Sequence, residues 1–335
     1  MLQFPFDKPE DGAPVEIADG LHWVRFTIPY VLNHVNIYLL RDGDGWLAID
    51  TCIDYPVARH LWTTLLERFS PLNRLLLSHF HIDHTGAAGW LHEQTGCQIL
   101  MSPVEYALME RFRAPWSAEL IESMRTNYLR MGCGAQEADE LAHARWVPTR
   151  HSGSTPRLDV PLLRGDEVTI GKRRWRVMVG RGHSPDGTLL YCADERLLVA
   201  GDTILPSISP FIGVDHRDPR ANPLQDYLDS LQDIEGELHD DALVLPGHGL
   251  PFRGVRERLQ ALHTHHEERN ERILAACRDS AKTVREIALA IFNRNLDGVM
   301  GMAMSETMAH VNWLIAQQRL SSTSHDGQLR LKTTT

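Results

Sequence analysis

The chain has 335 residues, 43% of them hydrophobic, so it can bury a large core and is not expected to be disordered. A formal net charge of −10 argues against a generic polyanion-binding surface, and five scattered cysteines without a CxxC pair argue against a disulfide framework or a cysteine-ligated zinc site. No signal peptide is recognisable and no apolar run approaches the ~20 residues that cross a bilayer, so we expect a cytoplasmic protein without membrane contact.

The first hundred residues predict strands separated by helices. Alternating or continuous apolar runs predict strands at 22–26, 35–40, 46–49 and 74–78. Apolar residues with helical spacing predict helices at 55–69 and 87–94. This alternation is typical of a layered α/β domain.

The second half of the chain contains two different regions. Residues 102–146 have no strand character and predict two or three helices, after which strands return at 175–179, 189–192, 197–200 and 242–245. We expect the α/β domain to comprise residues 1–258. Residues 259–335 predict three helices and a hairpin around Asp326-Gly327, which together indicate a small winged-helix-like module.

Histidine and aspartate residues recur directly after predicted strands. The strands supply, in chain order, Asp50, then His79, His81, Asp83 and His84, then His183, Asp202 and His248. In open α/β sheets, ligands bind beyond the carboxyl ends of the strands. We therefore expect these side chains to meet at one edge of the fold.

The residue types indicate a metal site. Imidazole nitrogens and carboxylate oxygens suit zinc, and they also suit iron and manganese. His79 and His81 are two residues apart and project to the same side of an extended backbone, whereas Asp83 and His84 follow and can face a second ion. We expect two divalent metal ions, with zinc favoured and iron or manganese as alternatives.

Four segments carry a resemblance to a known family. HFHIDHTG at 79–86, RGHSPDG at 181–187, AGDT at 200–203 and LPGHG at 245–249 resemble motifs of the metallo-β-lactamase fold superfamily. Their order, with an aspartate at position 202, resembles the glyoxalase II-like branch. The resemblance implies an αββα sandwich with a helical insertion, metals at one edge of two sheets, and a winged-helix-like C-terminal tail.

The resemblance also implies two ligand sets that share one residue: His79, His81 and His183 for the first metal ion, Asp83, His84 and His248 for the second, and Asp202 between them. Asp50 matches the family's first motif and would orient a ligand histidine from behind. Ser184, beside His183, is expected to support the ligands in the same way.

The expected reaction is hydrolysis by a hydroxide held between two metal ions. Metal coordination lowers the pKa of water to near 7 in the best-known zinc sites. The hydroxide would attack the carbonyl carbon of a thioester, lactone or ester, with Asp202 anchoring the metals and Asp83 steering the proton. Asp186-Gly187 replaces the Gly-His usual in glyoxalase II-type sequences, which argues against specificity for glutathione thioesters.

Residues 102–146 are expected to form a helical cap that supplies an apolar pocket over the metal ions. Large apolar residues in this segment, and two that follow Asp202, are the expected pocket residues: Tyr106, Met109, Phe112, Trp116, Met124, Tyr128, Phe211 and Ile212. The helical spacing of the apolar residues in 102–146 is also typical of helices that simply pack onto the domain. A pocket of this kind favours an acyl or aromatic small molecule as the substrate.

Other functions fit part of the sequence. A phosphodiesterase or ribonuclease could use the same metal site, but residues 265–335 hold nine Lys/Arg and eight Asp/Glu, whereas a nucleic-acid surface should be basic. The complete ligand set argues against a non-catalytic sensor, and Asp202 argues against a β-lactamase, which commonly has cysteine or serine there. A homodimer formed through the C-terminal module stays open. His263, His265 and His266 are expected to be solvated on a helix face.

Overall fold

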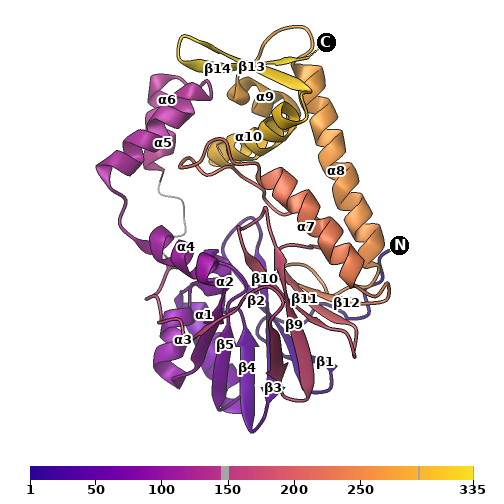
Figure 1. The fold of residues 1–335 in the computed structure, drawn as a ribbon. Helices are drawn as coiled ribbons and strands as arrows, with labels where there is room; N and C mark the ends of the chain where they lie inside the picture. The colour runs from indigo at the N-terminus through magenta and orange to yellow at the C-terminus, as the bar shows by residue number, and fades with distance from the viewer. Residues whose placement is uncertain (145–150, 293–294, 335) are drawn as a thin grey trace. The chain divides into compact units, whose positions relative to one another are not determined.

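The computed structural model describes residues 1–144, 151–292 and 295–334, and its contacts divide the chain into two units (Figure 1). The first unit contains residues 1–114, 151–210 and 230–259. The second contains residues 115–144, 211–229, 260–292 and 295–334. Every predicted metal ligand lies in the first unit.

A seven-stranded sheet forms the first layer of the first unit. Its strands follow chain order: β1 (Val15–Ala18), β2 (Leu21–Thr27), β3 (His34–Asp42), β4 (Gly45–Ile49), β5 (Leu72–Leu76), β6 (Gln98–Met101) and β7 (Val160–Pro161). The pairs from β1 to β4 are antiparallel, and those from β4 to β7 are parallel. β4 and β5 therefore end at the same edge of this sheet.

A five-stranded sheet forms the second layer. Its spatial order is β12 (Leu243–Pro246), β11 (Leu197–Gly201), β10 (Gly187–Cys192), β9 (Arg173–Gly180) and β8 (Glu167–Ile170). Only β11 and β12 pair in parallel, so the residues that follow them also end at a common edge. A hydrogen bond from the Thr188 N–H to the Ser78 carbonyl, 2.8 Å long, joins the two sheets near the start of β10.

Two apolar cores hold these layers together. The first lies between the sheets and contains inward-facing residues of both, such as Trp23, Leu76 and Trp175. The second lies between the seven-stranded sheet and the helices α1 (Pro56–Arg68), α3 (Ala88–Thr95) and α4 (Pro103–Arg113). Residues 230–237 of α7 (Pro223–Glu237) pack on the other sheet, where the Ser230 hydroxyl bonds the Val179 carbonyl. The predicted αββα sandwich is confirmed.

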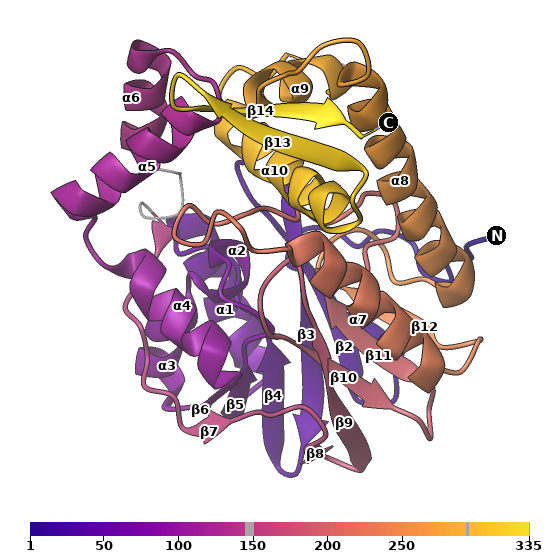
Figure 2. The ribbon, with the colours of Figure 1, turned by 45° about the horizontal axis from the view of Figure 1, so that its top comes forward.

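The regular elements of the second unit are helices and one hairpin. It contains α5 (Ala118–Arg130), α6 (Ala135–His143), residues 223–229 of α7, the part of α8 (Val255–Ala276) from residue 260 onwards, α9 (Val284–Ile291), α10 (Met300–Ala316), β13 (Leu320–His325) and β14 (Gln328–Thr333). Figure 2 shows the hairpin lying along α9 and α10. Asp326 and Gly327, with φ of 50° and 75°, make its turn, as the sequence predicts.

The segment predicted to form one cap is divided between the units. Its helix α4 packs in the core of the first unit, whereas α5 and α6 belong to the second; residues 145 and 146 lie outside the described residues. All five cysteines are buried and unpaired. Within the described ranges, no helix is both long and apolar enough to cross a membrane.

Candidate metal centre

The two parallel strand pairs bring the predicted ligands together. β5 ends at Leu76 beside β4, so the segment that carries His79 continues next to Asp50. β11 and β12 end in the same way, and they place Asp202 next to His248. His183 lies in the loop that joins β9 to β10. Strand ends from both sheets therefore converge, as the sequence predicts.

The first ligand group consists of His79, His81 and His183. Nδ1 of His81 lies 3.0 Å from Nε2 of His183, which in turn lies 3.3 Å from Nε2 of His79. His79 is buried, and the other two side chains are partly exposed. Three ring nitrogens thus converge on one point at the rim of the fold, an arrangement suited to a divalent metal ion.

The second ligand group consists of Asp83, His84 and His248. Oδ2 of Asp83 lies 3.3 Å from Nε2 of His248 and 3.8 Å from Nε2 of His84. Both histidines are buried, whereas the Asp83 side chain is 21% exposed. This group therefore consists of one partly exposed carboxylate and two buried imidazoles.

Asp202 lies between the two groups. Its Oδ2 is 3.5 Å from Nε2 of His183 in the first group and 3.2 Å from Nε2 of His248 in the second. Its Oδ1 is 3.4 Å from Nε2 of His84. One carboxylate thus contacts ligands of both groups, which is the geometry expected of a bridging residue.

The polar atoms at the centre fit a cation better than one another. Nε2 of His84, Nε2 of His248 and Oδ1 of Asp202 are buried, and their contacts of 3.2–3.4 Å lack the geometry of a hydrogen bond among the described residues. Buried polar atoms are rarely left without a partner unless an ion or water satisfies them. The chemistry of this donor set, imidazole nitrogen with carboxylate oxygen, matches divalent metal ions.

The pKa values report strong electrostatic coupling. Burial and the neighbouring His84 and His81 rings lower the pKa of His79 well below its usual value, and burial with His183 lowers that of His81 to about 3. Burial acts against protonation of His248 as well, but the Asp202 carboxylate outweighs it and raises the pKa to about 9. The imidazoles of His79 and His81 are therefore neutral, and a neutral imidazole can bind a metal ion. The raised pKa of His248 reflects negative charge from the neighbouring carboxylate, and this charge also favours a bound cation.

Asp50 hydrogen-bonds to His84 and to Ser78 behind the cluster. Its Oδ2 accepts a 2.8 Å hydrogen bond from Nδ1 of His84 and another of 2.8 Å from Oγ of Ser78. Its Oδ1 accepts one from the Ser78 N–H, also 2.8 Å. Because Nδ1 of His84 must carry the proton, its Nε2 is left with a lone pair directed at the ligand cluster.

The residues that hold His248 were not predicted for that role. Nδ1 of His248 donates to the carbonyl oxygen of His34 at 2.5 Å, and the Gly249 N–H donates to Nε2 of His34 at 2.7 Å. The amide of Asn36 donates to the carbonyl of Pro246 at 2.8 Å. A histidine and an asparagine around the start of an otherwise apolar strand are the only sequence signal for these contacts.

Gly247 is required by close packing. A Cβ atom at this position would overlap with Oδ1 of Asp202 and press against the ring of His84. Only glycine therefore allows the loop after β12 to pass this close to two ligands.

Glu105 was also missed by sequence reasoning. This buried carboxylate accepts hydrogen bonds from the N–H of Phe80, at 3.0 Å, and from the N–H of Asp186, at 2.7 Å. Ser184, expected to support the ligands, also hydrogen-bonds to it. Burial raises the pKa of Glu105 to about 7, against the effect of these hydrogen bonds. Nothing in the local sequence distinguishes it from an exposed glutamate of the first helical turn.

Three of the predicted pocket residues lie on α4 in the first unit. Phe112 stacks on Phe80, with ring centroids 4.7 Å apart, and Phe80 lies 4.4 Å from the ring of His81. Tyr106 is partly buried against the core, and Met109 is 1% exposed within it. Phe112 therefore packs against the ring that lies beside His81, whereas Met109 is enclosed in the core.

The other five predicted pocket residues belong to the second unit: Trp116, Met124, Tyr128, Phe211 and Ile212. Ile212 is buried and the others are partly exposed. The Tyr128 hydroxyl lies close to Gly301 at the start of α10, and the Phe211 ring lies close to Gly213. Helix α5 and the segment after Asp202 thus place their aromatic residues against small residues of the same unit.

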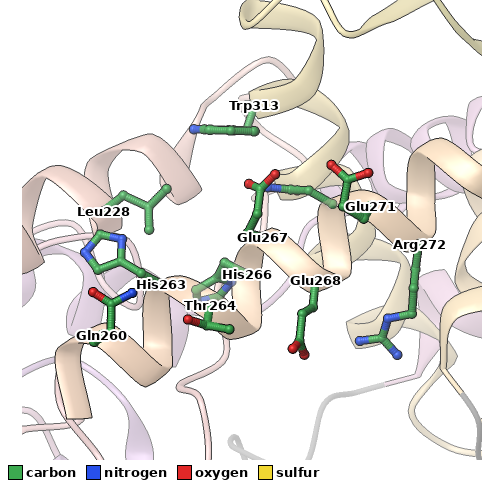
Figure 3. A pocket seen from close by; sticks show the side chains of 11 residues that line it. Leu228, Gln260, His263, Thr264, His266, Glu267, Glu268, Glu271, Arg272 and Trp313 are labelled. Atoms are coloured by element: carbon green, nitrogen blue, oxygen red, sulfur yellow. The ribbon is translucent and has the colours of Figure 1, made fainter. Parts of the chain in front are cut away.

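A groove along α8 in the second unit is separate from the ligand cluster. Figure 3 shows His263, Glu267 and Trp313 among its lining side chains. The expectation of solvated histidines is wrong for His266, which is buried, with its ring centroid 5.3 Å from that of His310. In the described part of the chain, no histidine of this helix joins a group suited to a metal ion.

Comparisons with known proteins agree with this geometry. Residues 30–248 match the metallo-beta-lactamase superfamily, and residues 271–334 match a metallo-beta-lactamase-like C-terminal domain. The crystal structure of a beta-lactamase domain protein from Burkholderia ambifaria is similar, with 33% identity and a TM-score of 0.90, over 99% of this chain and 98% of that protein.

Two curated relatives are more distant. The probable metallo-hydrolase YqjP of Bacillus subtilis is 22% identical over 89% of this chain and 93% of its own length. A hydroxyacylglutathione hydrolase from Rhodopseudomonas palustris is 22% identical over 50% of this chain and 47% of its own length. Since the family match covers most of the first unit and its ligand cluster, this chain belongs to the metallo-β-lactamase superfamily, whose members are metal-dependent hydrolases.

Proposed function

We propose that this chain is a two-metal hydrolase that cleaves a thioester, lactone or ester bond of an acyl or aromatic small molecule. The observation that carries the proposal is the position of Asp202, within 3.5 Å of ring nitrogens from both ligand groups. His79, His81 and His183 would hold one ion, and Asp83, His84 and His248 the other. Zinc suits this donor set, and iron or manganese are the alternatives.

The metal ions would supply Lewis acidity, which lowers the pKa of water and polarises a carbonyl oxygen. Residues of the chain would hold the ions and transfer protons. Asp202 contacts the first ligand group through Oδ2 and the second through both of its oxygens. Asp83 is more exposed than Asp202, so its carboxylate is the one placed to take and release a proton at the open side of the cluster. Asp50 holds the tautomer of His84.

An apolar surface beside the first ligand group supports an acyl or aromatic substrate. The stacked rings of Phe80 and Phe112 lie next to His81, so a substrate reaching this group would meet aromatic carbon on that side. A relative named for the hydrolysis of an acyl derivative of glutathione supports the same bond class. The Asp186-Gly187 replacement argues against glutathione itself as the recognised group.

The test begins with the metal content of the protein purified without added metal. The wild type is then assayed against thioesters, lactones, esters, phosphodiesters and β-lactams of matched size. We expect about two metal ions per chain and highest turnover on the carboxylic acid derivatives. Preferred cleavage of a phosphodiester, such as a labelled RNA at low salt, would assign the alternative function instead.

Asp202→Ala is the informative variant, and His263→Ala, on the groove of α8 away from the cluster, is its control. Asp202→Ala should lose metal and turnover together, because its two oxygens contact both ligand groups. Asp202→Ala with full metal content and full turnover would remove this residue from the mechanism.

A further inference from the structure

A buried carboxylate joins the two loops that carry the first ligand group. Glu105 lies in the first turn of α4 and is fully buried. One of its oxygens accepts from the Phe80 N–H at 3.0 Å, and the other accepts from the Asp186 N–H at 2.7 Å. Phe80 belongs to the loop after β5, and Asp186 belongs to the loop between β9 and β10. One side chain therefore ties together segments more than 100 residues apart.

Both tied positions lie next to metal ligands. Phe80 stands between His79 and His81 in the chain, and its ring centroid lies 4.4 Å from that of His81. That ring stacks on Phe112, near the other end of α4. The backbone and the side chain of Phe80 are thus both held by one helix.

The second loop is held at several points. Ser184, directly after His183, hydrogen-bonds to Glu105, and the Asp186 N–H donates to the same carboxylate. The Asp186 carboxylate accepts a hydrogen bond from the Ser102 hydroxyl, and Ser102 caps the N-terminus of α4. The first turn of α4 therefore holds the loop of His183 from both its backbone and its side chains.

We propose that Glu105 is a positioning residue that sets the spacing of the first ligand group. The proposal rests on the two-metal function proposed above. His79 and His81 come from one of the tied loops and His183 from the other, and Glu105 is the carboxylate that links them. The second ligand group is held by different contacts, from Asp50 and His34. Loss of Glu105 should therefore weaken one metal position and spare the other.

A carboxylate is needed because both backbone partners donate. Glutamine at this position would offer one acceptor oxygen, so its N–H₂ group would face either the Phe80 N–H or the Asp186 N–H. The two loops would then be held by one strong contact instead of two. Loss of outer contacts behind metal ligands typically lowers metal affinity by about 10–100-fold.

The experiment is a cobalt(II) titration of the full chain, followed by visible ligand-field absorption, which needs no substrate. His183→Ala and His248→Ala provide reference spectra for proteins that lack one ligand of the first or of the second group. For Glu105→Gln we expect about 10–100-fold weaker binding of one ion, about twofold or less change for the other, and a residual spectrum like that of His183→Ala.

Two controls separate positioning from general destabilisation. Asp159→Asn changes another carboxylate that accepts a backbone N–H, that of Ile99 at 3.0 Å, away from the ligand loops. Val24→Ala destabilises the core without touching them. Both should bind two cobalt ions normally. If Glu105→Gln does not fold, Ser102→Ala should show the same selective weakening on a smaller scale.

Equal weakening of both positions, or normal cobalt binding by Glu105→Gln, would overturn the role of Glu105 as a positioning residue. A wild-type protein that binds no ion would instead overturn the two-metal proposal itself. The two failures are therefore distinguishable within one set of titrations.

Discussion

Replacing Asp50 with asparagine tests whether the carboxylate behind the ligand cluster orients its histidines. Asp50 has a φ of 64°, a left-handed conformation that asparagine adopts more readily than most residues. Asp50→Asn therefore keeps the backbone and the side-chain volume, and changes one oxygen into an N–H₂ group. Asp50→Ala would add backbone strain and remove every contact at once.

The expected loss of metal affinity in Asp50→Asn follows from the number of hydrogen-bond donors that Asp50 accepts from. Three donors converge on the carboxylate at 2.8 Å: the Ser78 N–H, the Ser78 hydroxyl and Nδ1 of His84. Either orientation of an asparagine amide sets its N–H₂ group against at least one of them. A buried donor left without its acceptor costs about 1–3 kcal/mol, and we expect a loss of about 10–100-fold in metal affinity. Loss of the negative charge of Asp50 should weaken metal binding as well.

The assay is a zinc competition titration against a chromophoric chelator, combined with thermal unfolding of the metal-free protein. Ser78→Ala is the matched control, since it removes one hydroxyl and leaves two of the three hydrogen bonds to Asp50. Its affinity should fall less than that of Asp50→Asn. Zinc binding by Asp50→Asn within twofold of the wild type would show that the carboxylate does not orient the ligands.

Three further outcomes are expected. Gly247→Ala should lose most of its bound metal, measured by elemental analysis, because its methyl group overlaps with Asp202; normal metal content would contradict this. Phe112→Ala should raise KM for aromatic or long acyl substrates about tenfold at unchanged metal content, because it removes the ring stacked on Phe80; equal KM values would disprove the pocket contact. Burial and neighbouring positive charge hold the pKa of His310 well below 6.5, so the unfolded chain binds one more proton and stability falls as pH drops below 6.5. Denaturant unfolding of His310→Gln between pH 7.5 and 5 should show this slope reduced by up to about 1.4 kcal/mol per pH unit, and an unchanged slope would refute the assignment.

The ligand cluster could be predicted because its placement follows local rules. An apolar run predicts a strand, and polar residues directly after it lie at the strand's end. His79 and Asp202 both follow such runs, and neighbouring strands that point the same way bring their ends to one edge of the fold. Asp50 could be recognised on the same grounds. Most strands and the C-terminal hairpin followed from apolar periodicity and from the Asp326-Gly327 turn, whereas the arrangement of the strands in two sheets was implied by the family resemblance.

The polar residues behind the ligands could not be predicted in this way. Glu105 occupies the first turn of a helix, where glutamate is common and usually exposed, and its burial depends on two loops that approach from elsewhere in the chain. His34 directly precedes an apolar run, and it is a partner of His248 because β3 passes the loop that follows β12. His266 was expected in solvent and is buried.

The sequence by itself determined which side chains can bind a metal ion and at which strand ends they stand, because both depend on residues adjacent in the chain. The tertiary structure alone decided which distant backbone groups hold those side chains in place, and how the segment after β6 is shared between two units. The physical reason is that a buried hydrogen bond needs a partner whose position is set by the packing of the whole unit.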